Sequence, residues 1–168
     1  MDEDPLESLV PEALRELGAA ATDSPSNLTP SFRIWHYPQI GPWITWVLFV
    51  AEDSEPWVSE GLVRAVWWDR PEDLKAPPEE PSLGLKEAIV GPQDLHRLLG
   101  RASWVNLDYE RIVHGPLSAS EFGIEGFRNR ASTERVEWES PIPSGLRAIM
   151  AWHSKARGIL ERSLLTSQ

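Results

Sequence analysis

Four histidines are the residues of this chain best suited to hold a metal ion or to move a proton. His36, His96, His114 and His153 are separated by 60, 18 and 39 residues. No two of them have the i, i+4 spacing by which one helix presents two ligands to the same ion. The spacing therefore predicts no metal site and no cofactor.

One stretch contains the residue types of a hydrolytic triad. Asp108, His114 and Ser118 fall within eleven residues of one another. A serine nucleophile needs a base beside it and a third group that orients the base. These three types also occur together by chance in polar loops, so the stretch leaves both a hydrolase and a plain loop open.

Paired carboxylates are the second possible source of acid–base chemistry. Glu137 and Glu139 share one face of an expected strand, with Trp138 on the other face. Two neighbouring carboxylates can raise the pKa of one member enough for general acid catalysis. A solvated strand face opposite a buried tryptophan explains the same pattern. Glu121 and Glu125 carry the same two interpretations.

No motif with a defined mechanism supports these candidates. The chain contains no GxGxxG, GxxxxGK[ST], HExxH, GxSxG or EF-hand loop. The motif search therefore favours a protein that is not an enzyme. An enzyme whose site is assembled from distant residues, with His36, His114 or a glutamate as the acid or base, is the alternative.

Length and composition predict one globular domain. The 168 residues are 41% hydrophobic and 25% charged, with nine tryptophans and no cysteine. The longest apolar run, residues 43–51, is much shorter than the roughly 20 residues of a membrane-spanning helix. The acidic N-terminus lacks the features of a signal peptide, so we expect a cytoplasmic protein.

The net charge of −10 is unevenly distributed. Residues 1–87 contain 17 acidic and 6 basic residues, a net charge of −11, whereas residues 88–168 contain 9 acidic and 10 basic residues, a net charge of +1. Phosphate repulsion along the first half argues against direct binding of nucleic acid. A basic protein partner is electrostatically favoured, and solubility alone is the other explanation of the acidity.

Apolar periodicity predicts an α+β fold. A mainly antiparallel sheet of about five or six strands is packed by an N-terminal helix and a long C-terminal amphipathic helix. The expected parts of the domain are the N-terminal helix and linker (1–30), the sheet with its loops (31–140) and the C-terminal helix (141–168). Strands are expected at residues 32–37, 43–51, 62–68, 122–129 and 135–138, with 86–90 and 102–107 as candidates for a further short strand, and a short helix is expected at 94–99.

Several single residues have expected places in this fold. Residues 43–51 are apolar on both faces and indicate a central strand, whereas Arg64 interrupts an apolar run and is expected to face solvent. Gly123 and Gly126 indicate a bulge or a close backbone approach in the last hairpin. His153 lies on the apolar face of the last helix and is expected to be a core or boundary residue rather than a catalyst.

The C-terminal quarter resembles a known group of proteins. Its pattern is Gly123-Ile124-Glu125-Gly126-Phe127, then Val136-Glu137-Trp138-Glu139, then Pro143 and a helix with Trp152. This pattern is similar to that of small bacterial proteins, some of which are similar to immunity proteins encoded beside polymorphic toxins. The resemblance implies a non-catalytic protein that neutralises a partner, and it assigns no functional residue.

The first functional hypothesis is therefore an acidic binding protein that neutralises or regulates a basic protein partner, and the resemblance implies that this partner is a toxin. The alternatives are a structural or assembly subunit and the enzyme described above. Two acidic loops are expected to contact the partner, with a tryptophan as anchor. The candidate contact residues are Glu52, Asp53, Glu55, Trp57, Glu60, Asp69, Glu72 and Asp73.

Overall fold

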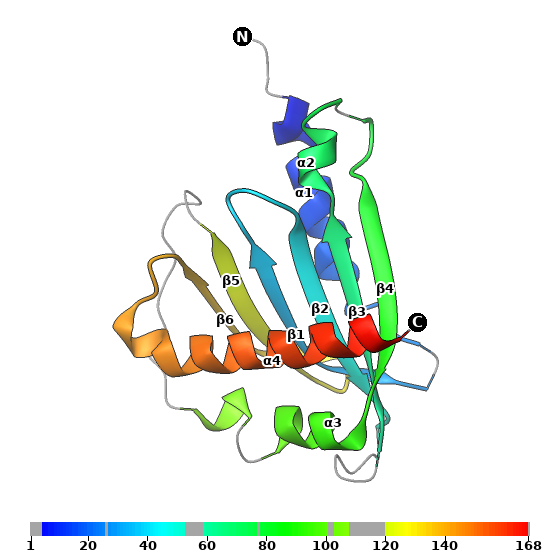
Figure 1. The fold of residues 1–168 in the computed structure, drawn as a ribbon, viewed down its shortest axis with the longest axis vertical. Coiled ribbons are helices and arrows are strands. Elements are labelled where there is room, and N and C mark those ends of the chain that lie inside the picture. The colour runs from blue at the N-terminus through cyan, green and yellow to red at the C-terminus, as the bar shows by residue number, and fades with distance from the viewer. Residues whose placement is uncertain are drawn as a thin grey trace.

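A computed structural model describes residues 5–25, 27–52, 59–76, 78–100, 103–107 and 120–167. The fold is α+β, as the periodicity predicts (Figure 1). Six antiparallel strands form one sheet in the order β4-β3-β2-β1-β5-β6. Asp53, Glu55 and Trp57, and the possible triad of Asp108, His114 and Ser118, lie outside the described residues.

The strands are β1 (Thr29–Tyr37), β2 (Trp43–Val50), β3 (Gly61–Trp68), β4 (Leu83–Val90), β5 (Glu121–Arg128) and β6 (Ala131–Glu139). The α-helices are α1 (Pro5–Ala19), α2 (Arg70–Asp73), α3 (Pro92–Leu99) and α4 (Arg147–Thr166). Two short 3-10 helices, η1 (Trp104–Asn106) and η2 (Ser144–Leu146), precede β5 and α4 respectively.

The sheet is covered on both faces by helices. Helix α1 packs on one face through Leu9, Ala13 and Leu17, where it meets buried residues of β2 and β3. Helices α3 and α4 pack on the opposite face, and α4 crosses the strands there (Figure 1). The long C-terminal helix therefore closes the larger of the two cores, as its apolar stripe predicts.

Strand β2 lies inside the sheet and is buried on both faces. Trp46 and Leu48 point into the core beneath α4, whereas Val47 and Phe49 point into the core beneath α1. Because both sides are covered, the strand needs no polar face, which confirms the interpretation of its continuous apolar run.

Arg64 of β3 is buried, so the prediction that it faces solvent is wrong. The residue is only 8% exposed, its guanidinium lies over the ring of Phe49, and its Nε donates to Glu87 at 2.7 Å. It also donates to the carbonyl oxygen of Ala20, just after α1. A charge in an apolar strand is tolerated here because it is paired and connects the sheet to the first helix.

Three local predictions need correction. Residues 104–106 of the expected strand at 102–107 form the 3-10 helix η1, because Trp104 is used to fill the core beside Trp152 instead of joining the sheet. The hairpin of β5 and β6 turns at Asn129 and Arg130, both with positive φ, rather than through a five-residue loop. Strand β4 begins at Leu83, earlier than expected.

Gly123 is required by a close approach of the Trp35 side chain. A Cβ atom at this position would lie 1.9 Å from Cζ2 of the Trp35 ring. The register of β5 and β6 shifts between Gly126 and Phe127, as a bulge does. Both findings confirm the structural interpretation of these glycines.

Candidate functional site

The predicted acidic contact residues are divided between the two ends of β3. Glu52 and Glu60 are exposed at the end where β2 leads into β3. Asp69 and Glu72 lie at the other end, after Trp68. An eight-residue strand separates the groups by roughly 25 Å. The two groups therefore form separate surfaces.

Asp73 belongs to the interior, unlike the other described acidic residues of this group. Its side chain is 2% exposed, and its Oδ2 accepts hydrogen bonds from Trp68 Nε1 at 2.6 Å and from the Ser82 amide at 2.9 Å. Burial opposes ionisation, but hydrogen bonds from Ser82 and Trp68 outweigh it and hold the pKa of Asp73 below its usual value. Asp73 stabilises the α2 end of the sheet and is not presented to a partner.

The α2 end also carries exposed apolar side chains. Ile40, in the turn between β1 and β2, is 90% exposed, and Leu74, directly after α2, is 53% exposed. Arg70 connects the two segments, because its guanidinium donates to the carbonyl oxygen of Gln39 at 2.9 Å and lies over the ring of Trp43. Glu72 of α2 pairs with Lys75, and the exposed acids Glu79 and Glu80 follow in the segment that leads to β4. We call Ile40, Asp69, Glu72, Leu74, Glu79 and Glu80 the α2 surface.

Two described histidines lie where α4 packs on the sheet, His153 on α4 itself and His36 on β1. His153 is 1% exposed, and its Nε2 lies 3.0 Å from the carbonyl oxygen of Trp35, so this nitrogen carries the proton. His36 stacks on Phe122 with ring centroids 4.3 Å apart and contacts Arg157. Burial is the main cause, and the charge of Arg157 a further one, that lowers the pKa of each histidine to about 4. The expected core position of His153 is confirmed.

This arrangement is poorly suited to acid–base catalysis near pH 7. Both rings are neutral there, and a base with a pKa near 4 accepts a proton only weakly. The nearby carboxylate of Glu161 binds Arg157 at 2.8 Å instead of orienting a histidine. A hollow of about 270 Å³ beside these residues is lined by Phe122, Met150, His153, Ser154, Arg157, Gly158 and Glu161.

The predicted carboxylate pair lies on the α1 face of the sheet, at the β6 edge. Glu137 and Glu139 share this face with Glu121 of β5, which pairs with Glu139 across the strands. Glu121 accepts a hydrogen bond from Trp35 Nε1 at 2.9 Å, and Glu137 pairs with Arg135. Burial raises the pKa of Glu121, and Glu137 and Glu139 add to the rise against the Trp35 hydrogen bond. Glu121 therefore holds the Trp35 side chain in place, and Glu137 holds that of Arg135.

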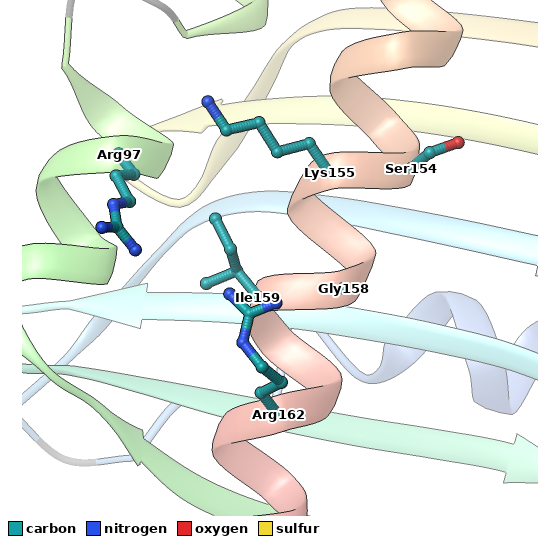
Figure 2. A pocket seen from close by; sticks show the side chains of 6 residues that line it. All are labelled: Arg97, Ser154, Lys155, Gly158, Ile159 and Arg162. Atoms are coloured by element: carbon teal, nitrogen blue, oxygen red, sulfur yellow. The ribbon is translucent and has the colours of Figure 1, made fainter.

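A second hollow, of about 340 Å³, lies between α3 and α4 (Figure 2). Arg97 reaches into it from α3, and Lys155 and Arg162 reach into it from α4. Ile159, Gly158 and Ser154 complete the lining. The sequence search missed this group, because a separation of 58 residues between Arg97 and Lys155 carries no recognisable pattern.

The described residues contain no cluster of three or more histidine and carboxylate side chains that could hold a metal ion. Within the same ranges, no helix is long and apolar enough to cross a membrane. No family model, curated protein or solved structure matches the chain.

Proposed function

We propose that this chain is a non-catalytic binding protein that neutralises or regulates a basic protein partner through the α2 surface. The observation that carries the proposal is the combination of exposed Ile40 and Leu74 with flanking carboxylates at one end of the sheet. Protein interfaces commonly combine apolar anchors with a polar rim, and complementary charge accelerates association.

The α2 surface is held in a defined shape, which lowers the entropic cost of binding. Arg70 connects α2 to the turn that contains Ile40, and Asp73 connects the same helix to Trp68 and Ser82. Pro71 and Pro81 further restrict the backbone around α2. A partner therefore meets a largely preformed surface.

The resemblance of the C-terminal quarter to immunity-like proteins agrees with this proposal and would make the partner a toxin. In that case the predicted contact residues Asp69 and Glu72 act together with Ile40 and Leu74. Glu52 and Glu60, at the opposite end of β3, belong to a separate surface and provide a natural control.

The test is affinity capture from the source cell with the wild type and two double variants. The association and dissociation rates of the captured partner are then measured with purified proteins. The double variant E79K/E80K reverses two exposed charges on the α2 surface, and E52K/E60K reverses two exposed charges at the other end. We expect a basic protein that binds the wild type and E52K/E60K but associates at least about tenfold more slowly with E79K/E80K at low salt.

A separate substitution tests Ile40 as the apolar anchor. Ile40→Asp should accelerate dissociation of that complex, because Ile40 is the most exposed of the large apolar side chains on the described residues. Equal association by wild type and E79K/E80K, or equal dissociation by wild type and Ile40→Asp, would refute the α2 surface as the contact.

The second candidate function is a self-assembling structural subunit. Strand β4 is an edge of the sheet, and its Leu85 and Ile89 side chains are 60% and 55% exposed on the α1 face. Antiparallel pairing with β4 of a second copy, centred on Glu87, would place Leu85 opposite Ile89. Each Glu87 is already bound by Arg64, which reduces the repulsion between the two carboxylates.

Sedimentation over a range of protein concentrations distinguishes this candidate. A dimer that dissociates in Leu85→Asp but persists in Ile142→Asp would support assembly through β4, since Ile142 is exposed just after β6, the opposite edge strand. A wild-type monomer at every concentration up to about 100 µM would exclude a stable assembly of this kind.

A further inference from the structure

We propose that the hollow between α3 and α4 binds a small ligand that carries a phosphate-type dianion. This site lies between two helices on the face of the sheet opposite α1, apart from the α2 surface (Figure 1). The proposal concerns a second ligand and does not depend on the protein partner.

The charge of the lining is the first argument. Arg97, Lys155 and Arg162 line the hollow, and none of its six lining residues is acidic. This concentration of positive charge stands out in a chain with a net charge of −10. Three cations around one hollow repel one another, and a bound dianion would relieve that repulsion.

The pairing of these cations is the second argument. Within the described ranges, Lys155 and Arg162 form no ion pair, and Arg97 binds Asp94 through Nη1 at 3.0 Å. Arg97 therefore keeps donors on its other nitrogen atoms for an oxyanion. Guanidinium groups match two oxygens of a phosphate at once, whereas the ammonium of Lys155 provides a mobile point charge.

The hollow on the other flank of α4 provides a contrast. It also contains an arginine, Arg157, but Glu161 binds that guanidinium at 2.8 Å and His36 contacts it at 3.2 Å. The charge of Arg157 is thus balanced within the protein. Among the described residues of the hollow between α3 and α4, Arg97 alone has a carboxylate partner, Asp94, so the charges of Lys155 and Arg162 are available to an external anion.

Shape and polarity restrict the ligand further. Figure 2 shows the three cationic side chains around Ile159, which is 3% exposed and supplies an apolar floor. A Cβ atom at Gly158 would meet only Arg162, at 3.9 Å, so the helix surface is open there. The volume of about 340 Å³ is at the lower end of the range of small-molecule sites. A phosphate monoester with a compact apolar group fits these features.

The test is a titration of the full chain, labelled with ¹⁵N, with inorganic phosphate, pyrophosphate and phenyl phosphate at constant ionic strength. We expect saturable shifts of the amides of Arg97 and residues 154–162, with phenyl phosphate bound more tightly than inorganic phosphate. The double variant K155Q/R162Q should weaken phenyl phosphate binding by about tenfold or more, because it removes two charge-assisted contacts.

The matched controls use exposed positions, so the variants should keep the fold. Arg147→Gln removes one exposed charge from the same helix outside the hollow and should change the affinity by less than about twofold. The single variants Lys155→Gln and Arg162→Gln provide the equal-charge comparison. A loss with Arg147→Gln as large as the loss with these variants would overturn the site, as would shifts that never saturate.

A short single-stranded DNA tests the other source of phosphate groups. A small-ligand site predicts that the oligonucleotide competes poorly with phenyl phosphate. Tight binding of the oligonucleotide that depends equally on Arg147, Lys155 and Arg162 would overturn the proposal in favour of a general cationic surface on α4.

Discussion

The Oδ2 atom of Asp73 lies 2.6 Å from Nε1 of Trp68, and this hydrogen bond anchors α2 to the last residue of β3. The same oxygen accepts the Ser82 amide at 2.9 Å, so one carboxylate joins three consecutive segments. The α2 surface is built on this junction. Asp73, predicted as a contact residue, is instead the group that holds this surface in place.

Asp73→Ala should destabilise the protein by about 2–3 kcal/mol, because it leaves a buried indole N–H and a backbone amide without their acceptor. Urea unfolding measures the change, with Glu72→Ala as the exposed neighbouring control. Since the pKa of Asp73 is lowered by folding, its charge stabilises the fold above about pH 4. The difference between wild type and Asp73→Asn should therefore shrink as the pH falls below that value.

The buried histidine of α4, His153, should make the fold sensitive to mild acid. Folding lowers the pKa of His153 to about 4, so between about pH 6.5 and pH 4 the unfolded chain binds a proton that the folded chain does not. Stability is then complete above about pH 6.5 and falls as the pH decreases. Protonation of His153 accounts for up to about 3 kcal/mol of this loss.

His153→Gln tests that origin, because the glutamine amide can still donate to the Trp35 carbonyl but does not titrate. Unfolding free energies measured from pH 7.5 to pH 4.5 should have a flatter slope in this variant than in the wild type. His96→Gln, at an exposed position, is the control. Parallel curves for wild type and His153→Gln would show that another group causes the acid sensitivity.

Gly123→Ala should be among the most destabilising small substitutions in the sheet. The added Cβ would lie 1.9 Å from the Trp35 ring, which is 1% exposed and has no free space into which to move. We expect a loss of about 2–3 kcal/mol in thermal or urea unfolding. Gly91→Ala is the matched control, since a Cβ there meets no atom within 4 Å, and its effect should stay within about 0.5 kcal/mol.

Loss of one member of the buried pair of Arg33 and Glu125 should destabilise the fold strongly, whereas replacement of both by apolar residues should destabilise it little. Their atoms are 2.5 Å apart, with side chains 8% and 9% exposed, and Arg33 also donates to the Gly18 carbonyl of α1. Glu125→Gln leaves a buried guanidinium without its counter-charge and should cost about 3–5 kcal/mol. The double variant R33M/E125L should recover most of that loss in urea unfolding. Equal destabilisation by the single and double variants would contradict this account.

Local patterns were sufficient to predict much of the fold. Gly123 indicated a close backbone approach, although not its partner, Trp35 of β1. The stripe of α4 and the apolar run of β2 each reflect which faces of a single element are buried. Such patterns depend on the periods of helices and strands, which the sequence displays directly. The core position of His153 followed from the same periodicity.

The failures involve interactions between distant residues. The burial of Arg64 depends on Glu87, 23 residues further on, and on a carbonyl group that follows α1. The burial of Asp73 depends on the chain returning at Ser82 to begin β4. The local charge pattern identifies neither partner, because it does not distinguish an exposed acid from a buried one.

By itself, the amino-acid sequence determined the α+β class, the antiparallel sheet between two helices and the uneven charge, because composition and periodicity are properties of the chain. Only the tertiary structure decided which charges reach solvent together. Strand β3 separates Glu52 and Glu60 from the α2 surface, and the packing of α3 beside α4 brings Arg97 to Lys155 and Arg162. Electrostatic interactions depend on distance in space, and the fold alone sets that distance.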